Sequence, residues 1–186
     1  LKRQGKICHY GVSVEKVDEA LEALNYDISA IEVIFNMFRL KPAEELFPKA
    51  SKQNVGIIVR VPLASGLLTG KYSEETTFGK ADHRCYNRNG EFFDKGETFS
   101  GVDYMTGVKA ARELKHLLHT DNLAARALRY ILMYPEVSTV ISGASSPAQI
   151  MENVKASSLP PFSHEEMEVV RQVYDKHIRP LVHHCW

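Results

Sequence analysis

Residues 55–61 read Val-Gly-Ile-Ile-Val-Arg-Val, and Pro62 follows them directly. A continuous apolar run of this kind is typical of a parallel strand that is covered on both faces. Proline has no backbone N–H and a fixed φ, so it ends the run. The stretch therefore predicts a buried parallel strand, and parallel neighbours require helical crossovers around it.

Similar β-prone runs occur three more times along the chain, at residues 7–12, 30–35 and 137–141. Apolar residues at spacings of three and four predict helices between and after them. The expected helices cover residues 14–24, 43–52, 104–118, 122–133, 147–154 and 164–182. The expected helix caps are Ser13, Thr120 or Asp121, and Ser163, and Pro42 and Pro147 are expected at helix starts. Four strand–helix units predict an α/β fold of parallel strands, either a doubly wound open sheet or part of a (β/α) barrel.

The chain has 186 residues and a mass of 21.0 kDa, which suits a single segment, residues 1–186, without an internal linker. A long loop of about residues 62–102 interrupts the rhythm. Loops of that length are usually functional or disordered. Four phenylalanines, at positions 78, 92, 93 and 99, argue against simple disorder.

Lys and Arg together number 23, as do Asp and Glu. This balance argues against nucleic acid or a membrane surface as partner, because both favour a basic excess. No apolar run reaches the roughly 18 residues of a membrane span, and the start lacks a secretory signal. Three widely spaced cysteines indicate reduced thiols and a cytoplasmic protein. The ending His183-His184-Cys185 is expected to be a frayed tail rather than a metal site.

The end of the third strand carries Gly66-x-x-x-Gly70-Lys71, which invites comparison with a phosphate-binding P-loop. A P-loop needs four residues between the glycines and Ser or Thr after the lysine. Here three residues separate them and Tyr72 follows, so this interpretation fails. What remains is flexible backbone and one cation that are able to follow a phosphate group.

The end of the fourth strand reads Gly143-Ala144-Ser145-Ser146-Pro147 and opens a helix. Free backbone N–H groups and the helix dipole favour an anion there. Gln149, Glu152 and Asn153 lie within one turn and could read an adenine edge or a ribose hydroxyl. A capped helix with a solvated polar face explains the same residues, and the spacing alone favours this second interpretation.

Three blocks together resemble the second half of an aldo-keto reductase. They are Gly-Lys-Ile with Gly-Val-Ser at residues 5–13, VPLASGLLTGKY at residues 61–72, and ISGASSPAQIMEN at residues 141–153. All three occur in the family's order and cover essentially the whole chain. The resemblance implies the C-terminal half of a (β/α)8 TIM barrel, with strands five to eight, and hydride transfer between a nicotinamide dinucleotide and a carbonyl.

The resemblance also implies cofactor contacts. Ser13 would lie near the nicotinamide carboxamide, and Glu32 stands where the family generally has Gln. Arg60 stands where many members stack an aromatic ring on the nicotinamide; a guanidinium can also stack, or bind a phosphate or a substrate carboxylate. The pyrophosphate would contact Pro62, Leu63, Ser65, Gly66 and Lys71, with Arg84 and Arg88 as clamps. The adenosine end would contact Gly143, Ser145, Gln149, Glu152 and Asn153.

The resemblance implies NADP(H) as the usual cofactor, with NAD(H) not excluded. Many members pair the 2′-phosphate of NADPH with Lys or Arg in the last block, where this chain has Gly143 and Gln149. The family's catalytic Asp, Tyr, Lys and His lie on its first four strands, and no position here matches their motifs. No residue is therefore assigned to catalysis, and none to a metal.

Three functions remain open at this stage. The first is the cofactor-binding half of a carbonyl reductase that acts on aldehydes or ketones, with the chemistry upstream of Leu1, which is not a methionine. The second is a non-catalytic nucleotide-binding or interaction module, and the third is an inactive fragment. An open sheet would expose edges at residues 7–12 and 137–141 and one apolar barrel-facing surface. We therefore expect self-association, or pairing with an N-terminal half-barrel.

Overall fold

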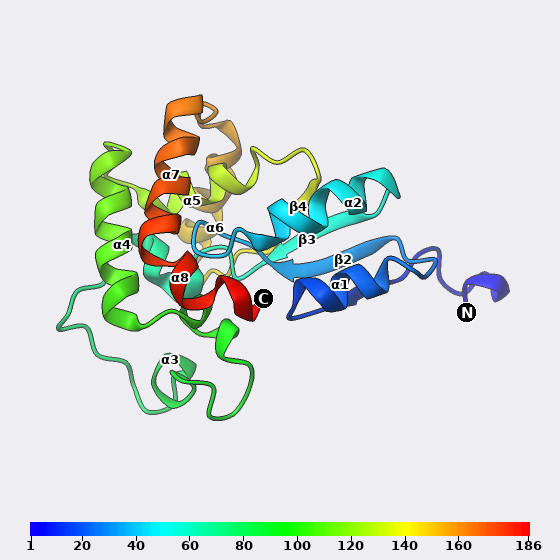
Figure 1. Ribbon diagram of the computed structural model, residues 1–186, viewed down its shortest axis with the longest axis horizontal. Coiled ribbons are helices and arrows are strands. Elements are labelled where there is room, and N and C mark those ends of the chain that lie inside the picture. Colours follow the sequence, from blue (N-terminus) through cyan, green and yellow to red (C-terminus); the bar gives the residue numbers. More distant parts are fainter.

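The computed structural model describes residues 1–186 and contains one parallel sheet of four strands (Figure 1). The strands lie in sequence order: β1 (Gly11–Ser13), β2 (Ala30–Ile34), β3 (Gly56–Arg60) and β4 (Val137–Val140). In register, Ile31 pairs with Val12 on one side and with Ile57 on the other. A doubly wound sheet reverses its strand order at a switch point. The unbroken order here excludes such a switch point within the sheet and is compatible with a barrel wall.

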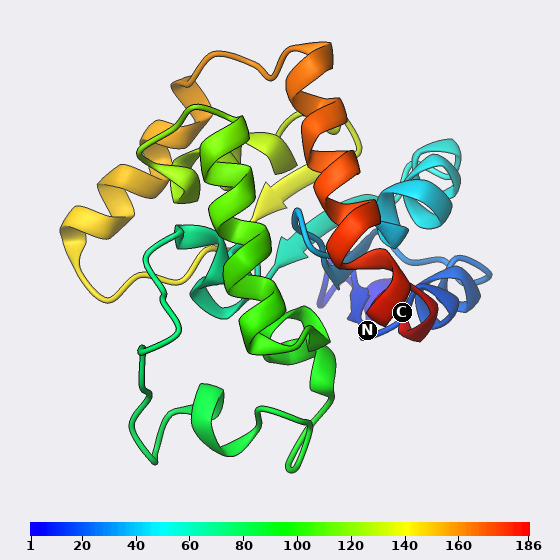
Figure 2. The ribbon, with the colours of Figure 1, turned by 60° about the vertical axis from the view of Figure 1, so that its left-hand side comes forward.

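Eight α-helices accompany the sheet. They are α1 (Val17–Ala23), α2 (Phe47–Lys52), α3 (His83–Tyr86), α4 (Tyr104–Leu117), α5 (Leu123–Ile131), α6 (Pro147–Lys155), α7 (His164–His177) and α8 (Arg179–Val182). A π-helical turn, Pro42–Leu46, leads into α2. Helices α4 and α7 lie side by side in both ribbon views (Figures 1 and 2). None of the helices is long and apolar enough to cross a membrane.

The two faces of the sheet differ in chemistry. One face packs into the core and is formed by alternate residues of β2 and β3 that are fully buried: Ile31, Val33, Ile57 and Val59. The opposite face carries Ser13, Glu32 and Arg60 together with Ile34 and Ile58. The expected apolar barrel-facing surface is therefore wrong. Polar side chains from three strands interrupt it.

The first strand and its helix differ from expectation. Residues 7–10 were predicted as part of the first strand but lie outside β1. One backbone hydrogen bond, from the N–H of Ser29 to the oxygen of Tyr10 at 2.8 Å, is what links this segment to the residue before β2. Ser13 lies in β1 and is not a helix cap. Helix α1 begins at Val17, and the Glu19 carboxylate accepts the backbone N–H of Lys16 at 3.0 Å.

Two other helix predictions differ from the structure: the cap of α5 and the continuity of the last helix. Asn122, and not Thr120 or Asp121, caps α5 by accepting the N–H of Ala125 at 3.1 Å. The last helix breaks between His177 and Arg179 because Pro180 has no N–H to continue the hydrogen-bond ladder. Ser163 does cap α7, as predicted, and accepts the N–H of Glu166 at 3.2 Å.

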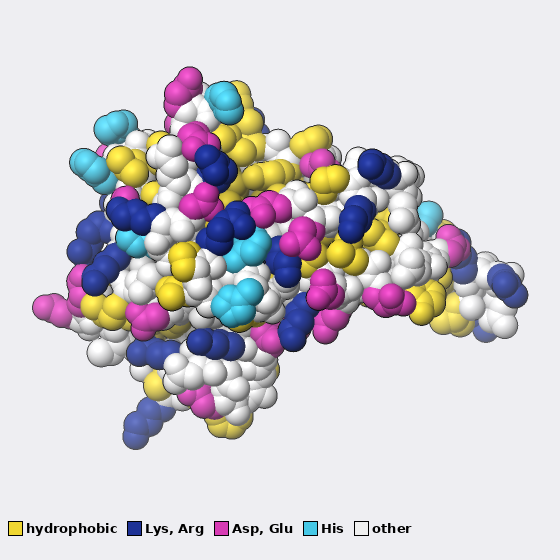
Figure 3. All heavy atoms as spheres, in the orientation of Figure 1, with side chains coloured by type: hydrophobic (Ala, Val, Ile, Leu, Met, Phe, Trp, Pro, Cys, Tyr) yellow, Lys and Arg dark blue, Asp and Glu magenta, His cyan; other side chains and the backbone are white.

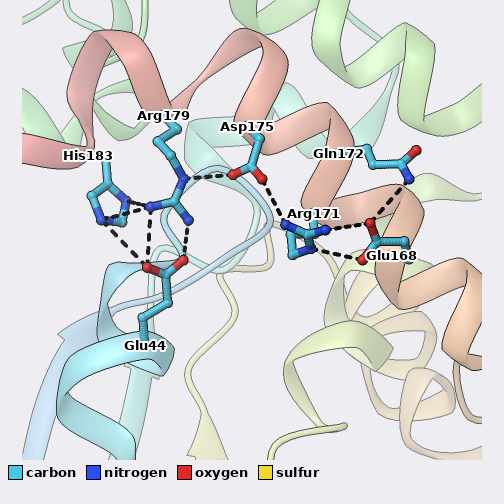
Figure 4. Close-up of polar contacts among 7 residues, drawn as sticks. All are labelled: Glu44, Glu168, Arg171, Gln172, Asp175, Arg179 and His183. Atoms are coloured by element: carbon cyan, nitrogen blue, oxygen red, sulfur yellow. Dashed lines mark hydrogen bonds and ion pairs between the residues drawn. The ribbon is translucent and has the colours of Figure 1, made fainter.

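The carboxyl end of the chain is ordered, so the expected frayed tail is wrong. Residues His183–Cys185 form a 3-10 turn, and Trp186 is only 5% exposed. The Arg39 guanidinium lies 4.0 Å from the centre of the indole ring. Figure 4 shows a polar network that joins this end to the turn before α2. In it, Arg179 binds Glu44 and donates to Asp175 at 2.6 Å.

The long segment after β3 forms a lobe around α3 (Figure 1). It contains 3-10 turns at Ala64–Thr69, Lys95–Glu97 and Phe99–Gly101. Phe99 is fully buried, and Phe78 packs against the same core. Phe92 and Phe93 stay exposed, so two of the four phenylalanines anchor the lobe. Cations and carboxylates are interspersed over the face in Figure 3, in keeping with the balanced charge.

Candidate functional site

A cavity of about 790 Å³ lies where the chain leaves β3 and β4. Val61 and Leu63 line it on the β3 side, and Gly143 and Asn153 line it on the β4 side. The lobe closes a third side through His83, Arg84 and Phe93. Parallel α/β folds place ligands at this end of their strands. The cavity is therefore the candidate site.

Ten of the fifteen residues predicted from the sequence line this cavity. They are Pro62, Leu63, Ser65, Gly66, Lys71, Arg84, Gly143, Gln149, Glu152 and Asn153. They come from sequence blocks about eighty residues apart, and β3 and β4 bring the blocks together because they are neighbours in the sheet. The structure thus unites the two motif blocks that sequence analysis considered separately.

The wall after β3 has an unusual backbone. Val61, Ala64 and Ser65 have φ angles of 49°, 48° and 54°, and Gly66 has 98°. Non-glycine residues rarely adopt this region, least of all a β-branched one, and such conformations gather at ligand sites. Asn36, which is fully buried, holds the turn because its Nδ2 donates to the oxygen of Val61 at 2.9 Å.

Two cations reach the cavity from the β3 side and the lobe. Lys71 is exposed and makes no ion pair. Arg84 donates to Asp82 through Nε at 2.8 Å and through Nη2 at 2.5 Å, and also contacts the Tyr72 hydroxyl. The hydrogen bond from Arg84 lowers the pKa of Asp82 to about 2. Lys71 therefore offers a free positive charge, while Arg84 is fixed in place by its carboxylate.

The wall after β4 is the start of α6. Ser146 caps the helix. Pro147 lies in its first turn, as predicted. Gln149 Oε1 accepts the N–H of Ser145 at 2.6 Å, and Asn153 Nδ2 donates to the oxygen of Gly143 at 3.4 Å. Glu152 pairs with Lys155 at 2.7 Å. Amides and a carboxylate thus line the cavity from a capped helix, and their contact with an adenine edge or a ribose stays a prediction.

Five predicted residues lie outside the cavity lining: Ser13, Glu32, Arg60, Arg88 and Ser145. Arg88 stacks over aromatic rings of the lobe, 5.2 Å from the centre of Tyr104. Ser145 reaches the cavity only through its bonds to Gln149. Ser13, Glu32 and Arg60 lie on the sheet face opposite Ile31 and Ile57, toward β1 and β2.

Arg60 belongs to a cluster of charges at the ends of β1, β2 and β3. Its guanidinium binds Glu97 through Nη1 and Glu15 through Nη2, the latter at 2.8 Å, and Glu32 lies 3.8 Å from Nε. Burial, followed by the neighbouring Glu97, raises the pKa of Glu15 to about 7. Arg39 is fully buried beside them, which lowers its pKa to about 10.

Sequence analysis missed Glu15, Arg39 and Glu97. Glu97 comes from the lobe, 37 residues after Arg60, and Glu15 precedes Arg60 by 45 residues. No periodicity or motif marks either carboxylate. The one signal in the sequence is Arg60 itself, because an arginine at the end of a strand predicted to be buried needs carboxylate partners from elsewhere in the chain.

The sequence matches the profile described as the aldo/keto reductase family over residues 1–175. The chain belongs to the aldo/keto reductase family. An uncharacterised oxidoreductase of Bacillus subtilis is 27% identical over 172 residues, which cover 92% of this chain and 51% of that protein. A probable voltage-gated potassium channel subunit beta of Arabidopsis thaliana is 32% identical over 69% of this chain and 38% of its own length.

Among solved structures, the glycerol dehydrogenase of Gluconobacter oxydans superposes with a TM-score of 0.71 at 26% identity. The match covers 96% of this chain and 52% of that enzyme. Its fold supports the assignment of the parallel α/β architecture. The chain thus spans about half the length of the first relatives that it matches.

Proposed function

We propose that this chain is the cofactor-binding half of an aldo-keto reductase, and that the whole protein reduces an aldehyde or a ketone. One observation carries the proposal: a single cavity gathers ten residues that the family resemblance assigns to the dinucleotide. The cofactor is NADP(H), with NAD(H) as the alternative. When bound, it would supply the hydride that reaches the carbonyl carbon.

Each wall of the cavity suits one part of a dinucleotide. Lys71 and Arg84 carry positive charge on the side where the backbone turns sharply, which suits the pyrophosphate. Gln149, Glu152 and Asn153 offer amides and a carboxylate, which suit the base and ribose. No cation among these three marks a 2′-phosphate, so the choice of NADP(H) rests on the family.

We further propose that residues 1–186 form one segment, the C-terminal half of the (β/α)8 barrel, with β1 to β4 as strands five to eight. The sequential strand order and the half-length matches support this. The catalytic Asp, Tyr, Lys and His would then belong to the other half. A cytoplasmic location agrees with three free cysteines.

The two outer strands support a proposal about partners. Ile141, Ile150, Met151 and Val154 are each more than half exposed beside β4, and β1 leaves the opposite edge unpaired. Unpaired edges with apolar neighbours favour association. We propose that an N-terminal half-barrel covers them, or that the isolated chain self-associates. Light scattering that shows a stable monomer of this chain would contradict both.

Titration of the chain with NADPH and with NADH, followed by nicotinamide fluorescence, tests the cofactor. We expect saturable binding of at least one, and no turnover of an aldehyde panel by this chain alone. Binding of neither nucleotide would favour the inactive fragment. Robust turnover would overturn the claim that the chemistry belongs to the other half.

A second candidate is a non-catalytic nucleotide-binding module. The potassium channel subunit among the relatives favours it, because its name is that of an auxiliary subunit rather than an enzyme. Nucleotide binding is expected in both cases. Turnover by the whole protein separates them, since a non-catalytic module should oxidise no NADPH in the presence of aldehydes or ketones.

A further inference from the structure

The Arg60 guanidinium is held at the end of β3 by carboxylates of the chain itself. Its side chain is 13% exposed, with Nη1 on Glu97 and Nη2 on Glu15. Nη2 also donates to the oxygen of Val14 at 3.2 Å. The Nε atom is buried and has no hydrogen-bond partner. A guanidinium that already binds one carboxylate through each of two nitrogens, with a third carboxylate, Glu32, 3.8 Å from Nε, has the chemistry of a carboxylate receptor.

Glu97 stands between Arg60 and the cavity. It lines the cavity and at the same time binds Arg60, which lies on the β1–β2 side. A ligand in the cavity therefore meets Glu97 before it meets Arg60. The Arg60–Glu97 pair divides the strand ends into an open part and a closed part, with Ser13 and Glu32 in the closed one.

The charged cluster around Arg39 and Arg60 can replace one bound carboxylate by another anion more readily than it can take up an additional anion. Four carboxylates, Glu15, Glu32, Asp94 and Glu97, surround only two guanidinium groups, Arg39 and Arg60. Burial raises the pKa of Glu15 to about 7, and the neighbouring Glu97 carboxylate adds to this shift. A further anion would increase the excess of negative charge, whereas an anion that replaces the Glu97 side chain leaves the charge unchanged.

The segment that carries Glu97 has a strained backbone. Phe99, Ser100 and Gly101 have consecutive φ angles of 56°, 54° and 71°. Ser65 ties the segment to the cavity wall, because its hydroxyl donates to the oxygen of Glu97 at 2.9 Å and accepts the N–H of Phe99 at 3.1 Å. These ties use the backbone of Glu97, so its side chain can leave Arg60 while they persist.

We propose that Arg60 is the receptor for a carboxylate on the carbonyl substrate, and that Glu97 occupies this receptor until the substrate displaces it. The inference rests on the proposed function and narrows its substrate class to aldehydes or ketones that bear a carboxylate. Arg60 then orients the substrate through Nη1, the nitrogen that Glu97 leaves, while Nη2 stays on Glu15 and on the oxygen of Val14. The exchange breaks one ion pair and forms another of the same charge.

Succinate is the probe, and Trp186 is the reporter. Trp186 is the only tryptophan, and its ring packs on Gly96 and Gly101, where an added Cβ would lie 2.8 Å and 2.6 Å from it. Displacement of Glu97 should therefore change tryptophan emission. We titrate the chain, saturated with NADPH, with succinate and in parallel with inorganic phosphate.

Three variants decide the outcome. Glu97→Gln keeps the backbone bonds but removes the competing charge, so it should tighten succinate binding about tenfold. Arg60→Met should abolish the saturable response. Arg60→Lys keeps the charge but has one nitrogen in place of the two that would bind Glu15 and the substrate, so it should weaken binding. Arg112→Gln, on an exposed arginine of α4 outside the cavity, is the matched control and should leave binding unchanged.

Equal succinate affinity in the wild type and Glu97→Gln overturns the inference. So does a response that survives Arg60→Met, or one that Arg84→Gln removes while Arg60→Met retains it. Phosphate that binds more tightly than succinate overturns the choice of carboxylate. NADPH affinity, measured on the same samples, distinguishes failure of the proposed function from failure of this inference. If the wild type does not bind NADPH, the proposed function is refuted. If it binds NADPH but does not respond to succinate, only this inference is refuted.

Discussion

The two halves of the strand-end surface differ, although they belong to one sheet. At β3 and β4, polar side chains surround an open cavity of about 790 Å³. At β1 and β2, the chain's own side chains fill the corresponding place: Arg60 binds Glu15 and Glu97, and Trp186 packs on the neighbouring Arg39. The same edge of a sheet thus offers a binding site only where the following segments leave it open.

Removal of Trp186 should have the largest effect, because it opens the closed half. Trp186→Ala leaves a void against Arg39, Gly96 and Gly101 and should lower the free energy of unfolding by about 3–5 kcal/mol. Chemical denaturation measures it. His184→Ala, in the exposed residue two positions earlier, is the control. Equal stability of the two variants would mean that the indole does not hold this half together.

A methyl group at Gly66 should damage the open half next. Its φ of 98° and a Cβ only 2.8 Å from Cζ of Tyr72 predict a loss of about 2–4 kcal/mol for Gly66→Ala and loss of NADPH binding. Gly79→Ala serves as its control in the same lobe, since nothing lies within 4 Å of its added Cβ. If Gly66→Ala binds NADPH as the wild type does, this wall does not contact the nucleotide.

Lys71→Gln tests the free cation of the open half. We expect NADPH binding about tenfold weaker, because one charge-assisted contact to a phosphate is lost. The loss should shrink at high salt, which screens an exposed charge. Lys52→Gln, at the end of α2 and away from the cavity, should bind as the wild type does. An unchanged affinity in Lys71→Gln would place the phosphates elsewhere.

The smallest expected effect concerns the closed half, where the ionisation of Glu15 should make the free energy of unfolding depend on pH. Its pKa is raised from 4.5 to about 7, so the folded chain holds the proton more tightly than the unfolded chain. The stabilisation is complete below about pH 4.5 and is lost as the pH rises through 7. With one third of the side chain exposed, solvent screening reduces it to about 1 kcal/mol. Denaturation at pH 5 and pH 8 measures it, and Glu15→Gln should remove the difference.

The open half was accessible to sequence analysis because its features are local. The apolar run before Pro62, the small residues at 143–146 and the capped start of α6 lie within a few residues of one another. The segments after β3 and β4 lie next to each other because these two strands are neighbours in the sheet. The family resemblance of these local blocks thus named ten residues that line one cavity, without knowledge of any tertiary contact.

The closed half was not accessible, for a physical reason. Arg60 finds its partners 37 and 45 residues away, and no local pattern specifies such distances. The same limit explains the errors at the carboxyl end, where Trp186 becomes buried only because Arg39 and two glycines form its socket. Ser13 was misassigned as a cap because β1 is extended through it.

The buried amide of Asn36 has a consequence for the order of folding. Its Nδ2 joins Val61, 25 residues away, to Ser100, 64 residues away. Contacts so distant in sequence close large loops and tend to form late. We expect the sheet to assemble before the turn after β3 locks, so amide protons near Val61 should exchange with solvent faster than those of β2 and β3. The cavity would then be the part of the molecule that opens most often.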